Sequence, residues 1–188
     1  MAKQIVSKYR IYIGGYDLSG DFNSCNLTAD VDEIESTSSG LSVSDKSFVP
    51  GLKTIKFDGE VFASHGTGEV EETVDSLLAA GSKIFTVYPS ITAGEIGYGF
   101  QAEELSISRA MKIADLSRIT INATKSEGIL LRLTSMEGAT TKTSTGTGTA
   151  RELGAVASGK TLYSYLQALY VKAGTTLTIT IESDEASN

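Results

Sequence analysis

Apolar and polar residues alternate along most of the chain, and this pattern predicts a protein built mainly from β-strands. Residues 5–13 form the first such segment, with a mostly apolar face. The same period recurs at residues 104–108, 118–122 and 177–181, and apolar runs typical of strands lie at 54–62, 83–88 and 129–136. Strands with one polar face are typical of antiparallel sheets. About eight to ten short strands indicate an antiparallel β-sandwich or barrel.

A single segment follows a helical period instead. Starting at Val70, apolar residues recur at positions i, i+4, i+7 and i+8, which places them on one face of a helix. Thr67 can cap the N-terminus, acidic residues in the first turns favour the helix dipole, and Gly81 follows the last apolar residue. The pattern predicts one short α-helix over residues 69–80, whose acidic side chains form a solvated face.

Two segments in the second half are less regular. Residues 160–172 fit both a helical and an alternating period, and we favour a strand because the neighbouring segments are strands. Residues 139–150 contain no large apolar residue to offset the entropy of ordering, so we expect a loop or a hairpin tip. The expected organisation is a β domain over residues 1–138, this loop, and a C-terminal β extension over residues 151–188 that either stands apart or belongs to the same domain.

The composition excludes several classes of protein. The lone Cys25 allows no intrachain disulfide, and one Cys with one His cannot build a Cys/His metal site. No apolar run approaches the roughly 20 residues of a membrane helix, and the N-terminus lacks the apolar core of a signal peptide. We therefore expect no metal, no cofactor and no membrane contact, and synthesis in a reducing cytoplasm.

The net charge of −7 argues against nucleic-acid binding through a basic surface. Residues 1–94 carry 13 acidic and 7 basic side chains, so most of the negative charge lies in the first half. One acidic group lies within the predicted helix. The other consists of Asp30, Asp32, Glu33 and Glu35.

One segment matches a nucleotide-binding motif. Residues 154–161, Gly-Ala-Val-Ala-Ser-Gly-Lys-Thr, fit the phosphate-binding loop, in which backbone N–H groups and a lysine hold phosphates. Such a loop follows a buried parallel strand and opens a helix, whereas the residues before Gly154 are polar and only 27 residues follow Thr161. We expect the match to be fortuitous, and Lys160-dependent binding of ATP would show otherwise.

Catalytic chemistry has little support in the sequence. Cys25 and His65 could form a nucleophile and base, yet neither lies in a local sequence typical of such a pair. Glu103 and Glu104 are adjacent in sequence, so in a strand their side chains point to opposite faces. We expect no catalytic residue and a protein that is not an enzyme. Nearly a quarter of the residues are Ser or Thr, and such a β protein is suited to assembly with other copies.

Three segments of the first third carry a resemblance to a known family. They are residues 8–20, 32–37 and 47–62. They contain, in order, a first strand with an Asp-Leu-Ser turn, an acidic stretch ending in Ser-Thr, and Phe-Val-Pro-Gly-Leu leading into a long strand. This order resembles the tail tube (major tail) proteins of long-tailed bacteriophages, closely over residues 3–63 and loosely over 64–135. Pro50 and Gly51 are expected to form a tight turn, because Pro fixes φ and Gly accepts positive φ.

The resemblance implies a β-sandwich subunit that forms hexameric rings stacked head to tail into the tail tube, the conduit for DNA during injection. It also implies a location in the virion and partners among tape measure, tail terminator and baseplate proteins. A stack of rings needs a heterologous contact that does not close, and open strand edges can supply polymerising surface. An acidic wall repels phosphate, so DNA would pass without specific binding.

Two Ser/Thr-rich segments, residues 36–51 and 139–150, are the expected contacts between subunits or rings, and deleting 140–149 is expected to weaken tube formation. The candidate contact residues are Phe48, Pro50, Gly51, Leu52, Thr143, Thr145 and Thr147, and the candidate lumen acids are Asp30, Asp32, Glu33 and Glu35. A solvated strand face explains these acids equally well. The alternative function is a capsid decoration or tail-surface β domain that binds a partner or a glycan.

Overall fold

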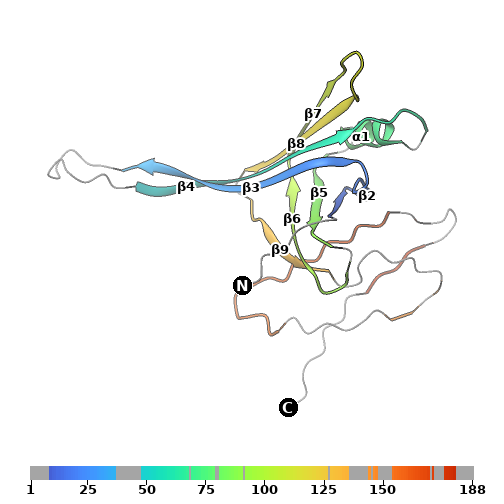
Figure 1. Cartoon of the computed structure of the whole chain (residues 1–188). Helices are drawn as coiled ribbons and strands as arrows, with labels where there is room; N and C mark the ends of the chain where they lie inside the picture. Colours follow the sequence, from blue (N-terminus) through green and yellow to red (C-terminus); the bar gives the residue numbers. More distant parts are fainter. Residues whose placement is uncertain are drawn as a thin grey trace.

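A computed structural model of the chain confirms the mainly β prediction. Its regular structure consists of two antiparallel sheets and one short helix (Figure 1). Neither sheet closes on itself, so the described residues form a sandwich and not a barrel. The structure describes residues 9–36, 48–67, 69–78, 81–90, 92–126, 128–135, 144, 146–147, 154–169, 171 and 176–180.

The first sheet has five strands in the order β2-β1-β5-β6-β9, and all neighbours are antiparallel. Its strands are β1 (Arg10–Ile13), β2 (Tyr16–Asp17), β5 (Lys83–Tyr88), β6 (Ile96–Ala102) and β9 (Leu131–Thr134). A two-residue turn joins β1 to β2, and its residues Gly14 and Gly15 have φ values of 56° and 92°. Glycine suits this turn because it adopts positive φ without steric cost.

The second sheet has four longer strands in the order β3-β4-β8-β7. Its strands are β3 (Phe22–Glu35), β4 (Phe48–Phe62), β7 (Glu104–Ala110) and β8 (Arg118–Ser126). β8 pairs with β4 only from Thr54 to Phe62, whereas β3 accompanies β4 over almost its whole length. The β3–β4 pair therefore extends beyond the rest of the sheet, as Figure 1 shows.

The hydrophobic core joins the two sheets. Phe22 and Phe57 enter it from the four-stranded sheet, and Phe85 and Phe100 enter it from the five-stranded sheet. The ring centroids of Phe57 and Phe85 are 5.1 Å apart, so this pair connects the sheets directly. Burial of one such side chain contributes about 1.5–3 kcal/mol to stability. The aromatic series therefore fixes how the two sheets are placed against each other.

The predicted helix is confirmed as α1 (Val70–Leu78). Val70, Val74 and Leu77 are buried on the core side, which is the face that the helical period assigns to them. α1 lies next to β7. It covers the core close to the edge of the four-stranded sheet.

The prediction of a strand at 160–172 is wrong for the described residues 160–169 and 171, which form neither strand nor helix. The predicted strand at 177–181 is likewise absent from residues 176–180. Alternating apolar residues favour a strand only where a partner strand offers cross-strand contacts. In both segments the described residues pair with no strand.

Three observed strands, the short β2 and the longer β3 and β6, were not among those that the alternation predicted. The outer part of β3 is exposed on both faces and therefore has no clear alternation. β6 contains Gly97 and Gly99, which usually weaken a strand. At Gly97 the Tyr88 ring occupies the space of a side chain, since a Cβ there would lie 2.3 Å from Tyr88 Cδ1. Gly97 is thus required for the packing of the Tyr88 ring and does not interrupt β6.

Candidate assembly surfaces

The distal part of the β3–β4 pair is a two-stranded ribbon, formed by residues 31–35 and 48–53. Beyond Thr54 no third strand among the described residues pairs with it. A two-stranded hairpin is at best marginally stable alone in water. The ribbon is therefore a candidate site of contact with another molecule.

The ribbon exposes an unusual amount of apolar surface. Five large apolar side chains on it are 45–58% exposed. They are Val31, Ile34, Phe48, Val49 and Leu52. Clustered exposed apolar side chains mark interaction surfaces more often than scattered ones do.

A β-bulge in the ribbon changes which side chains share a face. Val31 lies opposite Lys53, and Glu33 lies opposite Pro50, so β4 has one residue more than β3 over this interval. A bulge of this kind re-aims the side chains that follow it. Gly51 lies at the bulge, where an added Cβ would be 3.1 Å from the Asp32 carbonyl oxygen.

Pro50 and Gly51 were predicted to form a tight turn, and this prediction is wrong. Both residues lie inside β4, and Gly51 does not have positive φ. Pro50 is tolerated because β4 has a partner on only one side at this point, so no second strand requires its missing N–H. Pro50 and Gly51 therefore lie at a bulge in the ribbon and not at a turn.

The remaining candidate contact residues fall into two groups. Phe48 and Leu52 are exposed on the ribbon, as a contact site requires. Thr147 is exposed, and Thr143 and Thr145 lie outside the described residues. Of the candidate contact residues that the structure describes, all but Thr147 lie on the ribbon.

The four candidate lumen acids divide between the two faces of the ribbon. Opposite residues of an antiparallel pair share a face, and successive residues of a strand alternate. Ala29 lies opposite the buried Ile55, so Asp30 and Asp32 belong to the face that points away from the core. Glu33 and Glu35 belong to the other face. The four carboxylates therefore cannot all line one surface.

The face of the four-stranded sheet that points away from the core is mostly polar. It includes Thr28, Lys56, Asp58, Glu60, Ser106, Ser108, Thr120, Asn122 and Thr124. Glu60 pairs with Arg118 at 3.0 Å and accepts a hydrogen bond from Asn23 at 2.9 Å. Asp30 and Asp32 continue this polar face onto the ribbon.

Both outer strands of this sheet have an open edge. β3 pairs with β4 alone and β7 pairs with β8 alone among the described residues. An open edge presents unpaired N–H and C=O groups, which can bind a strand of another chain. The two open edges lie on opposite sides of the sheet.

A surface ion-pair network holds α1 against β7. Arg109 of β7 pairs with Glu71 at 3.4 Å and also with Asp75 of the same helix. His65 Nδ1 contacts the other oxygen of Glu71. The sequence predicted only a solvated face for the helix acids, whereas Glu71 and Asp75 also connect the helix to β7.

The structure gives no geometry for a pair of Cys25 and His65. His65 is exposed and contacts Glu71, whereas Cys25 packs against the core. Burial raises the pKa of the Cys25 thiol, which lowers its thiolate fraction near neutral pH. No three Asp, Glu, His or Cys side chains gather as metal ligands in the described part of the chain.

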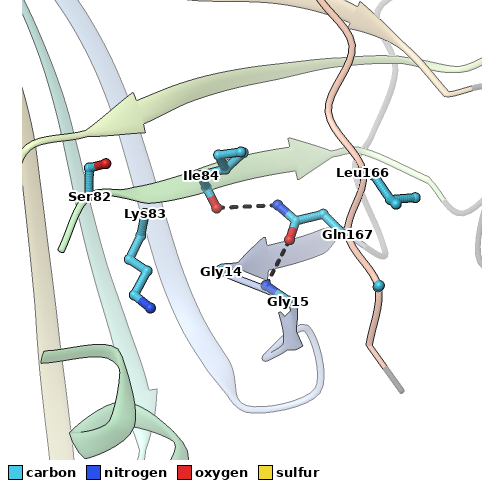
Figure 2. A pocket seen from close by; sticks show the side chains of 8 residues that line it. Gly14, Gly15, Ser82, Lys83, Ile84, Leu166 and Gln167 are labelled. Carbon is cyan, nitrogen blue, oxygen red and sulfur yellow. Dashed lines mark hydrogen bonds between the residues drawn. The ribbon is translucent and has the colours of Figure 1, made fainter. Parts of the chain in front are cut away.

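The segment of residues 154–169, which we call the arm, crosses the five-stranded sheet, and Gln167 forms hydrogen bonds to that sheet. Gln167 Oε1 accepts a hydrogen bond from the Gly15 N–H at 2.8 Å, and Nε2 donates to the Ile84 carbonyl at 3.2 Å. Figure 2 shows both bonds at a cavity of about 360 Å³. Among the described residues that line the cavity, Lys83 is the one with a charged side chain. The sequence pattern did not single out Gln167, because a lone glutamine carries no motif.

The arm does not have the geometry of a phosphate-binding loop. Gly159 has a φ of 76°, and the Lys160 N–H donates to the Ala157 carbonyl at 3.0 Å, which forms a turn. No helix begins after this turn within residues 161–169. The N–H groups that a helix start would offer to a phosphate are therefore not provided here.

No helix in the described ranges is long and apolar enough to cross a membrane.

The sequence matches no model of a protein family and no curated protein. The fold is similar to that of a chain in the solved virion of the native gene transfer agent (GTA) particle. That match has a TM-score of 0.51 and 12% identity, and covers 70% of this chain and 99% of that one. A chain in the tail of the empty GTA particle, solved by helical refinement with C6 symmetry, matches with a TM-score of 0.50, 12% identity and the same coverage. The fold of this chain is therefore one that occurs in the tail of a GTA particle.

Proposed function

We propose that this chain is a structural protein of a phage-like tail, in which it forms hexameric rings that stack into a tube. The observation that carries the proposal is the ribbon, which exposes five large apolar side chains and pairs with no third strand among the described residues. Burial of this surface against another copy would supply the stability that a two-stranded ribbon lacks. The fold shared with a chain of the GTA tail and the resemblance of residues 3–63 to tail tube proteins support the same function.

The ring forms when the open edge of β7 in one copy meets the open edge of β3 in the next. Such a contact is heterologous, and six repeats close it into a ring if the rotation at each step is 60°. The polar faces of the four-stranded sheets then surround the lumen. This places Asp30 and Asp32 on the lumen wall and directs Glu33 and Glu35 away from it.

A wall of this kind suits the passage of DNA. The chain carries a net charge of −7, and like charge repels phosphate at short range. The face assigned to the lumen has few apolar side chains on which bases could stack. The tube is a conduit with no specific DNA site, and its ends contact other tail proteins such as the tape measure, terminator and baseplate.

The ribbon provides a direct test of assembly by this route. We expect Phe48→Ser combined with Leu52→Ser to leave the circular dichroism of the subunit unchanged, because both side chains are exposed. The double variant should stay a small species in sedimentation velocity, where the unaltered protein sediments as large assemblies. A matched control is Leu78→Ser, which removes an equally exposed leucine from α1.

Two outcomes contradict the proposal. One is an unaltered protein that remains a monomer or trimer at high concentration, as a decoration or tail-surface domain would. The other is a double variant that assembles as well as the Leu78→Ser control.

A further inference from the structure

The loop between β7 and β8 displays three large apolar side chains. Met111, Ile113 and Leu116 are exposed, and Ile113 is 97% exposed. The loop has a defined turn, because the Asp115 N–H donates to the Lys112 carbonyl at 3.2 Å and the Leu116 N–H donates to Asp115 Oδ1 at 2.8 Å. A folded loop that holds apolar side chains in water is typical of a contact site.

A groove of about 270 Å³ lies where the ribbon leaves the four-stranded sheet. It is formed by β3, β4 and residues 128–130, which follow β8. Its lining includes Val31 and Ile129, and Ile129 is 62% exposed. Lys53, which lies on the same face as Val31, adds a positive charge. The groove can accept an aliphatic side chain with a charged neighbour.

The loop and the groove lie at opposite ends of one strand. β8 starts at Arg118, just after the loop, and ends at Ser126, just before residues 128–130. Nine residues of antiparallel strand span roughly 30 Å. Figure 1 shows the β7–β8 loop at the end of the sheet near α1 and the ribbon leaving from the other end. Within one chain they cannot meet, but in copies repeated end to end they face each other.

The two surfaces carry opposite charges at one position each. The loop carries Asp115, and the groove carries Lys53. Within the described part of the chain, neither side chain takes part in an ion pair. A pairing of Asp115 with Lys53 would favour one orientation of the loop in the groove.

We propose that residues 111–116 of one copy insert into the groove of the next copy along the tail tube, with Ile113 against Ile129 and Asp115 beside Lys53. The contact repeats without closing, which is the property that turns rings into a stack. It deepens the proposed function and rests on it, because a tube is the assembly in which copies follow one another end to end.

Cysteine cross-linking tests this contact in the full chain. In a Cys25→Ser background, Ile113→Cys and Ile129→Cys are made separately, and both replace exposed side chains. After mixing, assembly and mild oxidation, we expect disulfide-linked dimers of one chain of each kind. When both substitutions are in one chain, we expect a ladder of linked copies. The matched control uses Leu162→Cys in place of Ile129→Cys. Leu162 is an equally exposed residue of the arm, and its cysteine variant should give no dimer with Ile113→Cys.

The outcomes separate this contact from the proposed function. The loop contact is wrong if tubes of normal length form without a cross-link between positions 113 and 129. It is also wrong if cross-links form only between two Ile113→Cys chains. In both cases the tail-tube proposal still stands. An unaltered protein that forms no assembly overturns both. As a second measurement, Ile113→Ser should raise the protein concentration needed for tube formation roughly tenfold. An unchanged concentration overturns the loop contact.

Discussion

Individual glycines in the strands mark positions where another group occupies the space of a side chain. A Cβ at Gly59 would lie 2.3 Å from Phe22 Cε1, and one at Gly97 would lie 2.3 Å from Tyr88 Cδ1. At Gly97 the backbone oxygen of Val87 would also be only 2.6 Å away. Because that oxygen belongs to β5, it cannot move without disturbing the sheet. Gly97 is thus required by packing and not by its φ angle.

The first prediction concerns this position. Gly97→Ala should lower the free energy of unfolding by roughly 1–3 kcal/mol, the usual cost of overpacking. Chemical denaturation of the two proteins measures the difference. Gly20→Ala is the matched control, since a Cβ there meets nothing within 4 Å and should change stability little. Equal stability of the two variants would contradict the packing role of Gly97.

At the scale of elements, the arm depends on the five-stranded sheet for its position. Gln167 bridges the turn after β1 and the strand β5, and it satisfies the Gly15 N–H. The described residues of the arm form no strand pairing of their own. The two hydrogen bonds of Gln167 therefore contribute to the attachment of this segment, together with the Tyr165 ring, which lies over Gly99 of β6.

The second prediction follows for Gln167→Leu. Loss of the two hydrogen bonds should cost about 0.5–1.5 kcal/mol for each bond, and the arm should become more sensitive to proteases. Hydrogen exchange should accelerate at the Gly15 amide, while the strands of the four-stranded sheet keep their protection. Gln101→Leu removes an exposed glutamine that donates to Ser82 and is the control. Unchanged exchange at Gly15 would show that Gln167 does not anchor the arm.

The sequence predicts those elements in which alternation or helical spacing matches burial. The helix at 70–78 and the strand at 83–88 are such cases, because their apolar faces pack on the core. It fails for β3, whose outer half is a strand only because β4 lies beside it. It fails again at 160–172, where the alternation is present but the described residues have no partner strand. The period of apolar residues is visible within a single segment, whereas the strand that pairs with that segment is not.

Prediction of the candidate surfaces has the same limit. Phe48 and Leu52 could be chosen from a motif, and both are exposed on the ribbon. The division of the four acids between two faces depends on how β3 pairs with β4. The order of the acids in the chain does not reveal that pairing. Met111, Ile113 and Leu116 lie between two strands, and an apolar Met-Lys-Ile-Ala-Asp-Leu loop was the signal that could have identified them.

At the scale of the whole molecule, the proposed tube gives different roles to acids that are close in sequence. Asp30 and Asp32 lie on the polar face assigned to the lumen, and Glu33 and Glu35 lie on the opposite face. Substitutions on the two faces can change the net charge by the same amount. A difference in behaviour would then reflect position alone.

The third prediction uses this pairing. Tubes of Asp30→Lys with Asp32→Lys should retain single-stranded or duplex DNA at low salt, because the lumen wall becomes attractive to phosphate. Tubes of Glu33→Lys with Glu35→Lys carry the same added charge and should retain clearly less. Fluorescent DNA co-sedimenting with the tubes measures retention, and rising salt should release it. Equal retention by both variants would contradict the assignment of the lumen face.

Electron microscopy of the purified, unaltered protein tests the central claim most directly. We expect hollow tubes, or rings whose class averages show six-fold symmetry, with no protein density along the central axis. Protein that remains as separate monomers or trimers over a wide range of concentrations would contradict it.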